Sequence, residues 1–246
     1  MSKELIKIDN LCRDFIVGEE TVHALRNIQF SVDAGEFVTI MGTSGSGKST
    51  LLNLLGCLDS PTSGDYLLDG FSIQKMDKDE RAIIRNKKIG FVFQSYNLLP
   101  KTTAIENVEL PLIYNQDVSS KERRERAIAA LEEVGLGSRM HHKSNQLSGG
   151  QQQRVAIARA LVNNPLIILA DEATGNLDTH TSYEILALFQ RLYHDGRTIL
   201  FVTHNPELSK FCSRNIVLRD GKVVNDTRNE AIASAEEALA SLPKED

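Results

Sequence analysis

The chain contains a glycine-rich stretch whose residue types suit the binding of phosphate. Residues 42–49 read GTSGSGKS, which is a glycine, four residues, and then Gly, Lys and Ser, the phosphate-loop pattern. Glycines let the backbone N–H groups of such a loop converge on phosphate oxygens, and a helix expected from about Lys48 adds its positive end. Lys48 is expected to neutralise the β- and γ-phosphates, and Ser49 to hold Mg²⁺. The predicted phosphate-loop contacts are Gly42, Thr43, Ser44, Gly45, Ser46, Gly47, Lys48, Ser49 and Thr50.

Two adjacent carboxylates suit the hydrolysis of a bound nucleotide. Asp171 and Glu172 follow the apolar run LIILA, at the expected end of a strand. Side chains alternate in direction along a strand, so Asp171 is expected to face the metal and Glu172 a water beyond the γ-phosphate. The alternative interpretation is two surface acids at a strand end.

His204 ends the next apolar run, TILFVTH. If the two runs are parallel strands, His204 lies at the same sheet edge as Asp171, where ligands of open α/β sheets collect. We therefore expect it to contact the γ-phosphate. The remaining histidines are expected to be structural: His23, His141, His142, His180 and His194.

The elements that must position these residues are readable from apolar periodicity. Alternating runs over residues 4–40 predict an antiparallel sheet that leads into a buried strand at 37–41. Residues 94–161 have a helical texture, and apolar strands are expected at 165–170 and 198–203 with a helix between them. A hairpin is predicted about Asp220 and Gly221, and the tail from Arg228 is expected to form one helix that frays at Pro243.

Length and composition indicate one large domain without a general nucleic-acid surface. The 246 residues include 28 basic and 33 acidic side chains, a net charge of -5. The cysteines are odd in number and widely spaced, which favours buried thiols in a reducing compartment over disulfides or a metal cluster. The segment 1–15 lacks a signal-peptide core, and no stretch approaches about 18 apolar residues, so the chain is expected not to cross a membrane by itself.

With four further motifs the chain resembles the ATP-binding-cassette (ABC) ATPases. These are LSGGQ at 147–151, Gln94 in FVFQSYN, NLD at 176–178 and His204 at the end of TILFVTH. The resemblance covers about residues 4–224. It implies an α/β fold with a P-loop core of mixed and parallel sheet, an N-terminal antiparallel β subdomain and an inserted α-helical subdomain. The implied single nucleotide-binding domain, 1–246, divides into core and β parts at about 1–93 and 162–224, a helical subdomain at about 94–161, and a tail at 225–246.

The resemblance also implies that the second glycine motif binds the ATP of another copy. The expected helix QQQRVAIARAL starts at Ser148, Gly149, Gly150 and Gln151. This helix start offers a hydroxyl, backbone N–H donors and a helix dipole, which together suit an anion, but the sequence pattern places no phosphate near it. Two monomers packed head to tail would place each such turn against the partner's γ-phosphate. Asp178 would position the opposite subunit's site across this dimer.

Two further residues receive roles from the resemblance. Gln94 would touch Mg²⁺ or the attacking water and report the nucleotide state to a partner. Phe15 matches the aromatic residue that stacks on adenine, with a core aromatic as the alternative. The implied catalytic set is Glu172, His204, Gln94 and Lys48, the metal set is Ser49, Gln94 and Asp171, and the cofactors are ATP and Mg²⁺.

The chain departs from the family pattern at two positions beside the site. Family members usually have Pro after the catalytic Glu, where this chain has Ala173, and often an acidic residue after the switch His, where it has Asn205. Loss of Pro removes a fixed φ beside Glu172. We therefore predict weakened or unusual hydrolysis.

The residues around the motifs resemble those of the subgroup that serves macrolide exporters, lipoprotein release and related peptide-export or peptide-sensing systems. This implies an integral membrane permease on a separate chain, contacting a groove near residues 94–106, and a peripheral location at the cytoplasmic face of the inner or plasma membrane. DNA-repair cassettes, which carry a long insertion, translation-associated cassettes, which carry two phosphate loops, and small-molecule kinases fit poorly. A non-transport regulator, such as a cell-division ATPase, stays open because the same cassette can move a substrate or only its partner.

Overall fold

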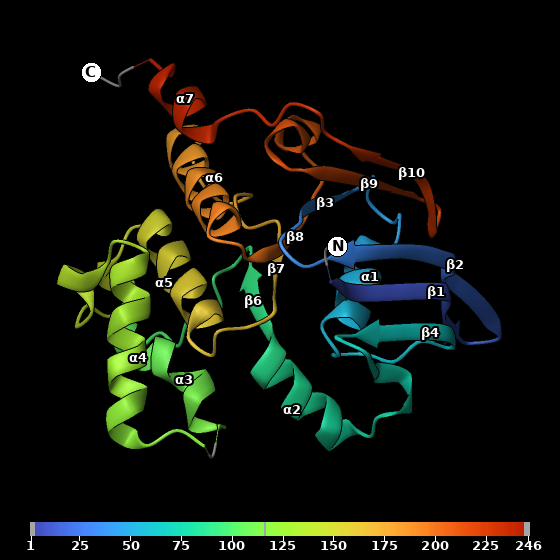
Figure 1. Cartoon of the computed structure of the whole chain (residues 1–246), viewed down its shortest axis with the longest axis horizontal. Helices are drawn as coiled ribbons and strands as arrows, with labels where there is room; N and C mark the ends of the chain where they lie inside the picture. The colour runs from blue at the N-terminus through green and yellow to red at the C-terminus, as the bar shows by residue number, and fades with distance from the viewer. Residues whose placement is uncertain (1–2, 116, 244–246) are drawn as a thin grey trace.

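The computed structural model describes residues 3–115 and 117–243, which form two sheets and a group of helices (Figure 1). The first sheet is antiparallel, in the order β2-β1-β4-β5. Its strands are β1 (Glu4–Val17), β2 (Glu20–Asp33), β4 (Ser63–Leu68) and β5 (Phe71–Ser72). The predicted antiparallel sheet is therefore present. Its third and fourth strands, β4 and β5, come from a later segment for which the sequence analysis predicted no strand.

The second sheet carries the ends of the predicted catalytic strands. Its order is β10-β9-β3-β8-β7-β6, and all neighbouring pairs are parallel except β10 with β9. The strands are β3 (Phe37–Met41), β6 (Ile89–Phe93), β7 (Ile167–Asp171), β8 (Thr198–Thr203), β9 (Arg214–Arg219) and β10 (Lys222–Arg228). The mixed α/β fold predicted from sequence is confirmed.

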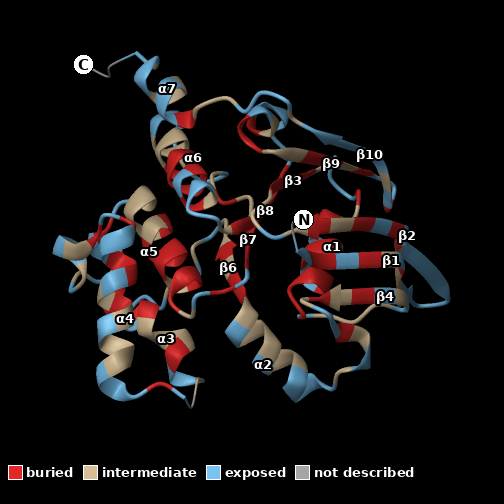
Figure 2. Ribbon diagram, in the orientation of Figure 1, coloured by how far each residue is buried: buried red, intermediate tan, exposed pale blue. Residues whose placement is uncertain are grey.

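Successive residues of the central strands enter different hydrophobic cores, which explains their continuous apolar sequence. In β7, Ile168 and Ala170 pack with the helices, whereas Ile167 and Leu169 pack with α1 (Lys48–Leu55) and the antiparallel sheet. Figure 1 shows this sheet between the two layers, and Figure 2 shows buried residues along its strands. The sheet edge that holds Asp171 is thereby fixed from both sides.

Three helices form the predicted helical part beside this core: α3 (Ala104–Ile113), α4 (Ser120–Glu133) and α5 (Gly149–Leu161). Each begins at a residue whose side chain accepts a backbone hydrogen bond, namely Thr103, Ser119 and Ser148. The other helices are α2 (Lys78–Lys88), α6 (Thr179–His194) and α7 (Ala235–Ala240), and short 3₁₀ turns span Ile73–Lys75, Gly137–Arg139, Ser144–Gln146 and Pro206–Phe211.

Other expectations meet mixed outcomes. The hairpin about Asp220 and Gly221 is present, with φ of 49° and 72°. The tail helix is shorter than predicted, because β10 runs to Arg228 and α7 covers only Ala235–Ala240; residues 244–246 lie outside the described part.

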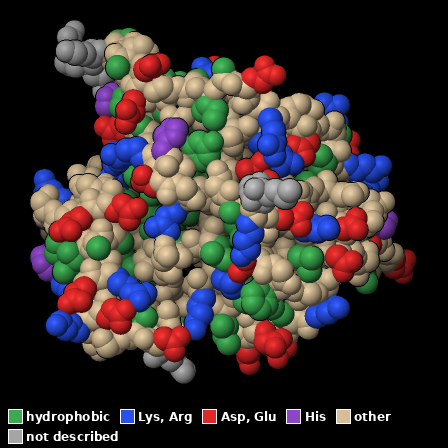
Figure 3. Space-filling view, in the orientation of Figure 1, with side chains coloured by type: hydrophobic (Ala, Val, Ile, Leu, Met, Phe, Trp, Pro, Cys, Tyr) green, Lys and Arg blue, Asp and Glu red, His purple; other side chains and the backbone are tan. Residues whose placement is uncertain are grey.

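The three thiols are free within the described residues, and burial raises the pKa of Cys57 to about 11. The described helices include none that is long and apolar enough to span a membrane. Acidic and basic side chains are interspersed on the face shown in Figure 3, in line with the balanced composition.

Candidate nucleotide site

The phosphate loop connects β3 to α1 and depends on glycine at its last turn. Gly47, which precedes the first residue of α1, has a φ of 101°. A Cβ atom at this position would lie 2.8 Å from the carbonyl oxygen of Ala24, so a larger residue does not fit. The loop is also held by the β9–β10 hairpin, because the N–H of Gly221 donates to the carbonyl of Ser46 at 3.1 Å.

Lys48 is fixed against the loop that precedes it. The side chain is 9% exposed, and Nζ donates to the carbonyl oxygens of Gly42 at 2.7 Å and Thr43 at 2.9 Å. Both bonds keep the ammonium group at the wall of the cavity, where it can attract phosphate oxygens.

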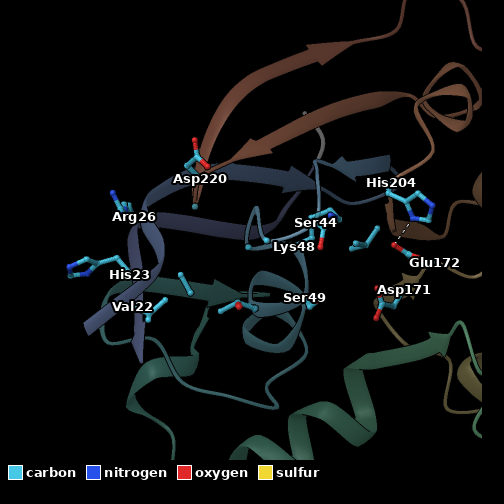
Figure 4. A pocket seen from close by; sticks show the side chains of 16 residues that line it. Val22, His23, Arg26, Ser44, Lys48, Ser49, Asp171, Glu172, His204 and Asp220 are labelled. Carbon is cyan, nitrogen blue, oxygen red and sulfur yellow. Dashed lines mark hydrogen bonds and ion pairs between the residues drawn. The ribbon is translucent and has the colours of Figure 1, made fainter. Parts of the chain in front are cut away.

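A cavity of about 650 Å³ runs along the loop (Figure 4). One end holds Asp171, Glu172 and His204, and Ser44, Lys48 and Ser49 lie along its middle. The other end is lined by residues that the sequence analysis did not assign to the nucleotide site, namely Val22, His23, Ala24, Arg26, Asp220 and Gly221. They come from β2 and the β9–β10 turn, and no local motif places them beside the phosphate loop, because long-range packing brings them there.

The carboxylates and the histidine meet at one edge of the parallel sheet. Asp171 ends β7 and His204 directly follows β8, and these strands are parallel neighbours. Nδ1 of His204 lies 2.7 Å from Oε1 of Glu172. Glu172 has a left-handed backbone with a φ of 44°, so its side chain leaves the strand in a direction that regular β structure would not give. The structure thus brings together the acids and histidine that the sequence predicted.

The pKa of Asp171 is raised above its ordinary value of 3.8. Burial is the main cause, and the negative charge of Glu172 adds to it, while Lys48 acts in the opposite direction. A cation beside Asp171 would offset both effects.

Two side chains that line the cavity offer donor atoms that suit Mg²⁺. Ser49 and Asp171 both line the cavity and offer a hydroxyl and a carboxylate oxygen, the ligand type that Mg²⁺ prefers. The described residues contain no cluster of three or more His, Cys, Asp or Glu side chains able to hold a metal ion.

Gln94 and Phe15 do not line the cavity. Nε2 of Gln94 donates to Oδ1 of Asn176 at 3.2 Å, and Nδ2 of Asn176 donates to the backbone carbonyl of Gln94. Phe15 is 37% exposed near the tip of the β1–β2 hairpin, with the guanidinium of Arg13 4.5 Å from the centre of its ring. It is not a core aromatic, and it is paired across the strands with Val22, which does line the cavity.

The LSGGQ turn, residues 147–151, lies outside this cavity and against the start of α6. Ser148 caps α5 by accepting from the N–H of Gln151. A side chain at Gly150 would collide with Thr181, which itself donates to the capping Asp178. These hydrogen bonds lower the pKa of Asp178. The residues predicted to act on a second nucleotide therefore lie on neighbouring helix starts.

Comparison with known proteins places these features in one family. The family model described as "ABC transporter" matches residues 25–175. The chain is 54% identical over 226 residues to the uncharacterized ABC transporter ATP-binding protein YvrO of Bacillus subtilis, covering 92% of this chain and 98% of that protein. It is 48% identical to the macrolide export ATP-binding/permease protein MacB of Brucella melitensis, over 96% of this chain but only 36% of that longer protein.

Solved structures agree. The ATP-binding cassette MJ0796, seen as a dimer in a post-hydrolysis state bound to ADP and Pi, has a TM-score of 0.82 and 50% identity, over 91% of this chain and 98% of that chain. The cbiO1 protein of Clostridium perfringens, part of an ABC transporter complex, has a TM-score of 0.81 and 28% identity, over 97% of this chain and 92% of that chain.

Proposed function

This chain belongs to the ABC transporter family as an ATP-binding and ATP-hydrolysing subunit, and we propose that two copies of it close on two ATP molecules to drive a membrane permease on a separate chain. One observation carries the proposal. The glycine-rich start of α5 can bind an anion but does not line this chain's own nucleotide cavity.

Within one chain, the cavity residues divide the work of hydrolysis. Lys48 and the N–H groups of the loop hold the β- and γ-phosphates. Glu172 accepts a proton from the attacking water, and His204 holds the carboxylate and contacts the γ-phosphate. Ser49 and Asp171 would hold Mg²⁺, which when bound neutralises charge that develops on the phosphates; Gln94 would join them after leaving Asn176. Phe15 would stack on adenine.

Between chains, the turn at 148–151 and Asp178 would complete the partner's site. The dimer has a two-fold axis, so each copy gives one turn and receives one. Because bound ATP lies in the interface, it stabilises the closed dimer, and hydrolysis removes that stabilisation. The dimeric state of the similar cassette MJ0796 supports this arrangement.

The permease is proposed to dock in an apolar groove beside α2 and α3. Its volume is about 620 Å³. None of residues 94–106 lines it, so this proposal places the docking surface outside the range that the sequence analysis expected. Ile83, which is 56% exposed, and Tyr114, which is 73% exposed, stand in it. Such exposure of large apolar side chains is typical of a protein interface. The groove is lined mainly by Leu58, Ala82, Ile83, Phe91, Leu110, Pro111 and Tyr114.

Export is the proposed task of the complex, and the cassette would lie at the cytoplasmic face of the membrane. The MacB relatives, named for macrolide export, support this, although the chain spans only about a third of their length. The alternative is an ATPase that moves or regulates a membrane partner without transport, because the cassette chemistry is the same in both.

Glu172→Gln tests the chemistry and the dimer together. The variant should bind ATP but lose hydrolysis by at least about 100-fold, and should elute as an ATP-dependent dimer in size-exclusion chromatography with light scattering. Glu133→Gln, at the exposed end of α4, is the control and should behave as the parent chain. A Glu172→Gln variant that stays monomeric with ATP, even with its membrane partner, would contradict the proposal.

A tagged pull-down from detergent-solubilised membranes of the native host tests the partner. Mass spectrometry should find a stoichiometric membrane protein with a large extracytoplasmic domain. Recovery of ribosomes or DNA-repair factors without a membrane protein would overturn the transport assignment but leave the ATPase chemistry intact.

A further inference from the structure

Gln153 is a buried amide directly behind the proposed catalytic loop. It lies one turn into α5 and is 0% exposed. Its Nε2 donates a 2.7 Å hydrogen bond to the carbonyl oxygen of Ala173, the residue that follows Glu172. The helix whose first turn is proposed to face a partner's nucleotide thus holds the peptide next to this chain's own base.

This peptide has a strained backbone that needs support. Glu172 has a φ of 44°, a left-handed conformation that costs energy for a residue with a side chain. Its N–H donates to the carbonyl of Val202 at 2.9 Å and its carbonyl accepts from Gly175 at 2.8 Å. Ala173 lacks the fixed φ of proline, so the bond from Gln153 supplies a restraint on the C-terminal side of Glu172.

Packing does not explain an amide at position 153. Its Oε1 atom is buried without a hydrogen-bond partner among residues 3–115 and 117–243. A buried acceptor left unpaired lowers stability, and Met would fill similar space without that cost. The contribution of Gln153 is therefore its donor group, and the acceptor of that group is the catalytic loop.

We propose that Gln153 is a positioning residue that fixes the carboxylate of Glu172 from the helix carrying the LSGGQ turn. The proposal rests on the proposed function, in which two copies hydrolyse ATP between them. In each copy, α5 then acts twice: its first turn acts in trans on the partner's ATP, and Gln153 acts in cis on Glu172. When the dimer closes on the turn at 147–151, a displacement of α5 is therefore passed through Gln153 to Glu172, the proposed general base of the same chain.

Mixed dimers separate these two actions. Two full-length copies with different tags are co-purified, and one copy is silenced by Glu172→Gln. The live site then uses Glu172 of the active copy and the 147–151 turn of the silenced copy. Gln153→Met is placed in either copy, and single-turnover phosphate release and ATP binding are measured. Gln152→Met in the active copy is the matched control, because the Gln152 amide donates instead to the carbonyl of Leu147.

We expect Gln153→Met in the active copy to slow phosphate release by about 10- to 100-fold with ATP binding unchanged, since a small displacement of a catalytic group has effects of this size. In the silenced copy it should change the rate less than about twofold. Equal losses in both placements would show a general defect of α5 and overturn the inference, as would an unchanged rate in the active placement. A parent pair that neither dimerises with ATP nor releases phosphate would instead overturn the proposed function.

Discussion

The imidazole of His204 and the carboxylate of Glu172 form a hydrogen-bonded pair at 2.7 Å, although the residues are 32 positions apart. The pair exists because β7 and β8 are parallel neighbours that end at one edge of the sheet. The carboxylate proposed to activate water is thus already held by the side chain proposed to contact the γ-phosphate.

Removing the imidazole should therefore impair catalysis more than binding. We expect His204→Ala to lower kcat by about 100-fold with little change in ATP affinity, because the carboxylate loses its orienting partner. Steady-state ATPase assays and binding of a fluorescent nucleotide check this. His180→Ala is the control, since His180 is an exposed histidine 3.6 Å from Glu184 on α6. An equal loss of kcat in both variants would contradict the role given to the hydrogen bond between His204 and Glu172.

Asp171→Asn should stabilise the protein at neutral pH in the absence of metal and nucleotide. The pKa of Asp171 is raised above 3.8 in the folded state, so between these two values the folded chain binds more protons than the unfolded chain. Stability then falls as the pH rises through that window, and above it the full penalty of the buried charge remains. Thermal unfolding in EDTA from pH 4 to 8 should show an increase in Tm that shrinks at the acid end. An increase independent of pH would point to another cause.

Ala173→Pro should raise the rate of hydrolysis. The substitution restores a fixed φ beside Glu172 and reduces the freedom of the loop that places the base. The measurement is kcat for the variant and the parent chain at saturating ATP, with Tm as a check on folding. An unchanged rate would dispose of the idea that Ala173 weakens catalysis.

A charge in the apolar groove should abolish docking of the membrane partner without affecting ATP binding. Ile83→Asp places a carboxylate where a partner would bury apolar surface. Val224→Asp on β10 is a matched control, because Val224 is 53% exposed and Ile83 is 56% exposed. Co-purification with the partner should be lost for the first variant only. Retained co-purification would place the partner elsewhere.

The sequence predicted best what is encoded locally. The phosphate loop, the apolar strand before Asp171 and the Asp220–Gly221 turn each follow from a few adjacent residues, because glycine, β-rich runs and turn residues restrict the backbone directly. The parallel α/β core followed from the alternation of strand, helix and strand, whereas the mixed sheet was implied by the family resemblance.

What sequence reasoning missed depends on long-range contact. β4 pairs with β1 across more than fifty residues, for example Ile6 with Leu68, and its short run lacks a strong pattern. The contact of the Arg13 guanidinium with the Phe15 ring and the hydrogen bond from Gln153 to Ala173 are side-chain contacts that no local pattern in the sequence encodes. The left-handed backbone of Glu172 likewise results from tertiary packing, so local propensity could not predict it.

The hydrogen bond from Gly221 to Ser46 bears on how the phosphate loop folds while the chain is being synthesised. A loop encoded near the start of the chain receives one of its supports from a turn encoded 175 residues later. Ribosomes deliver the chain from its N-terminus, so a nascent chain that ends before the hairpin lacks this support. The phosphate loop therefore reaches its full set of backbone hydrogen bonds only after the hairpin has been synthesised and has packed against it.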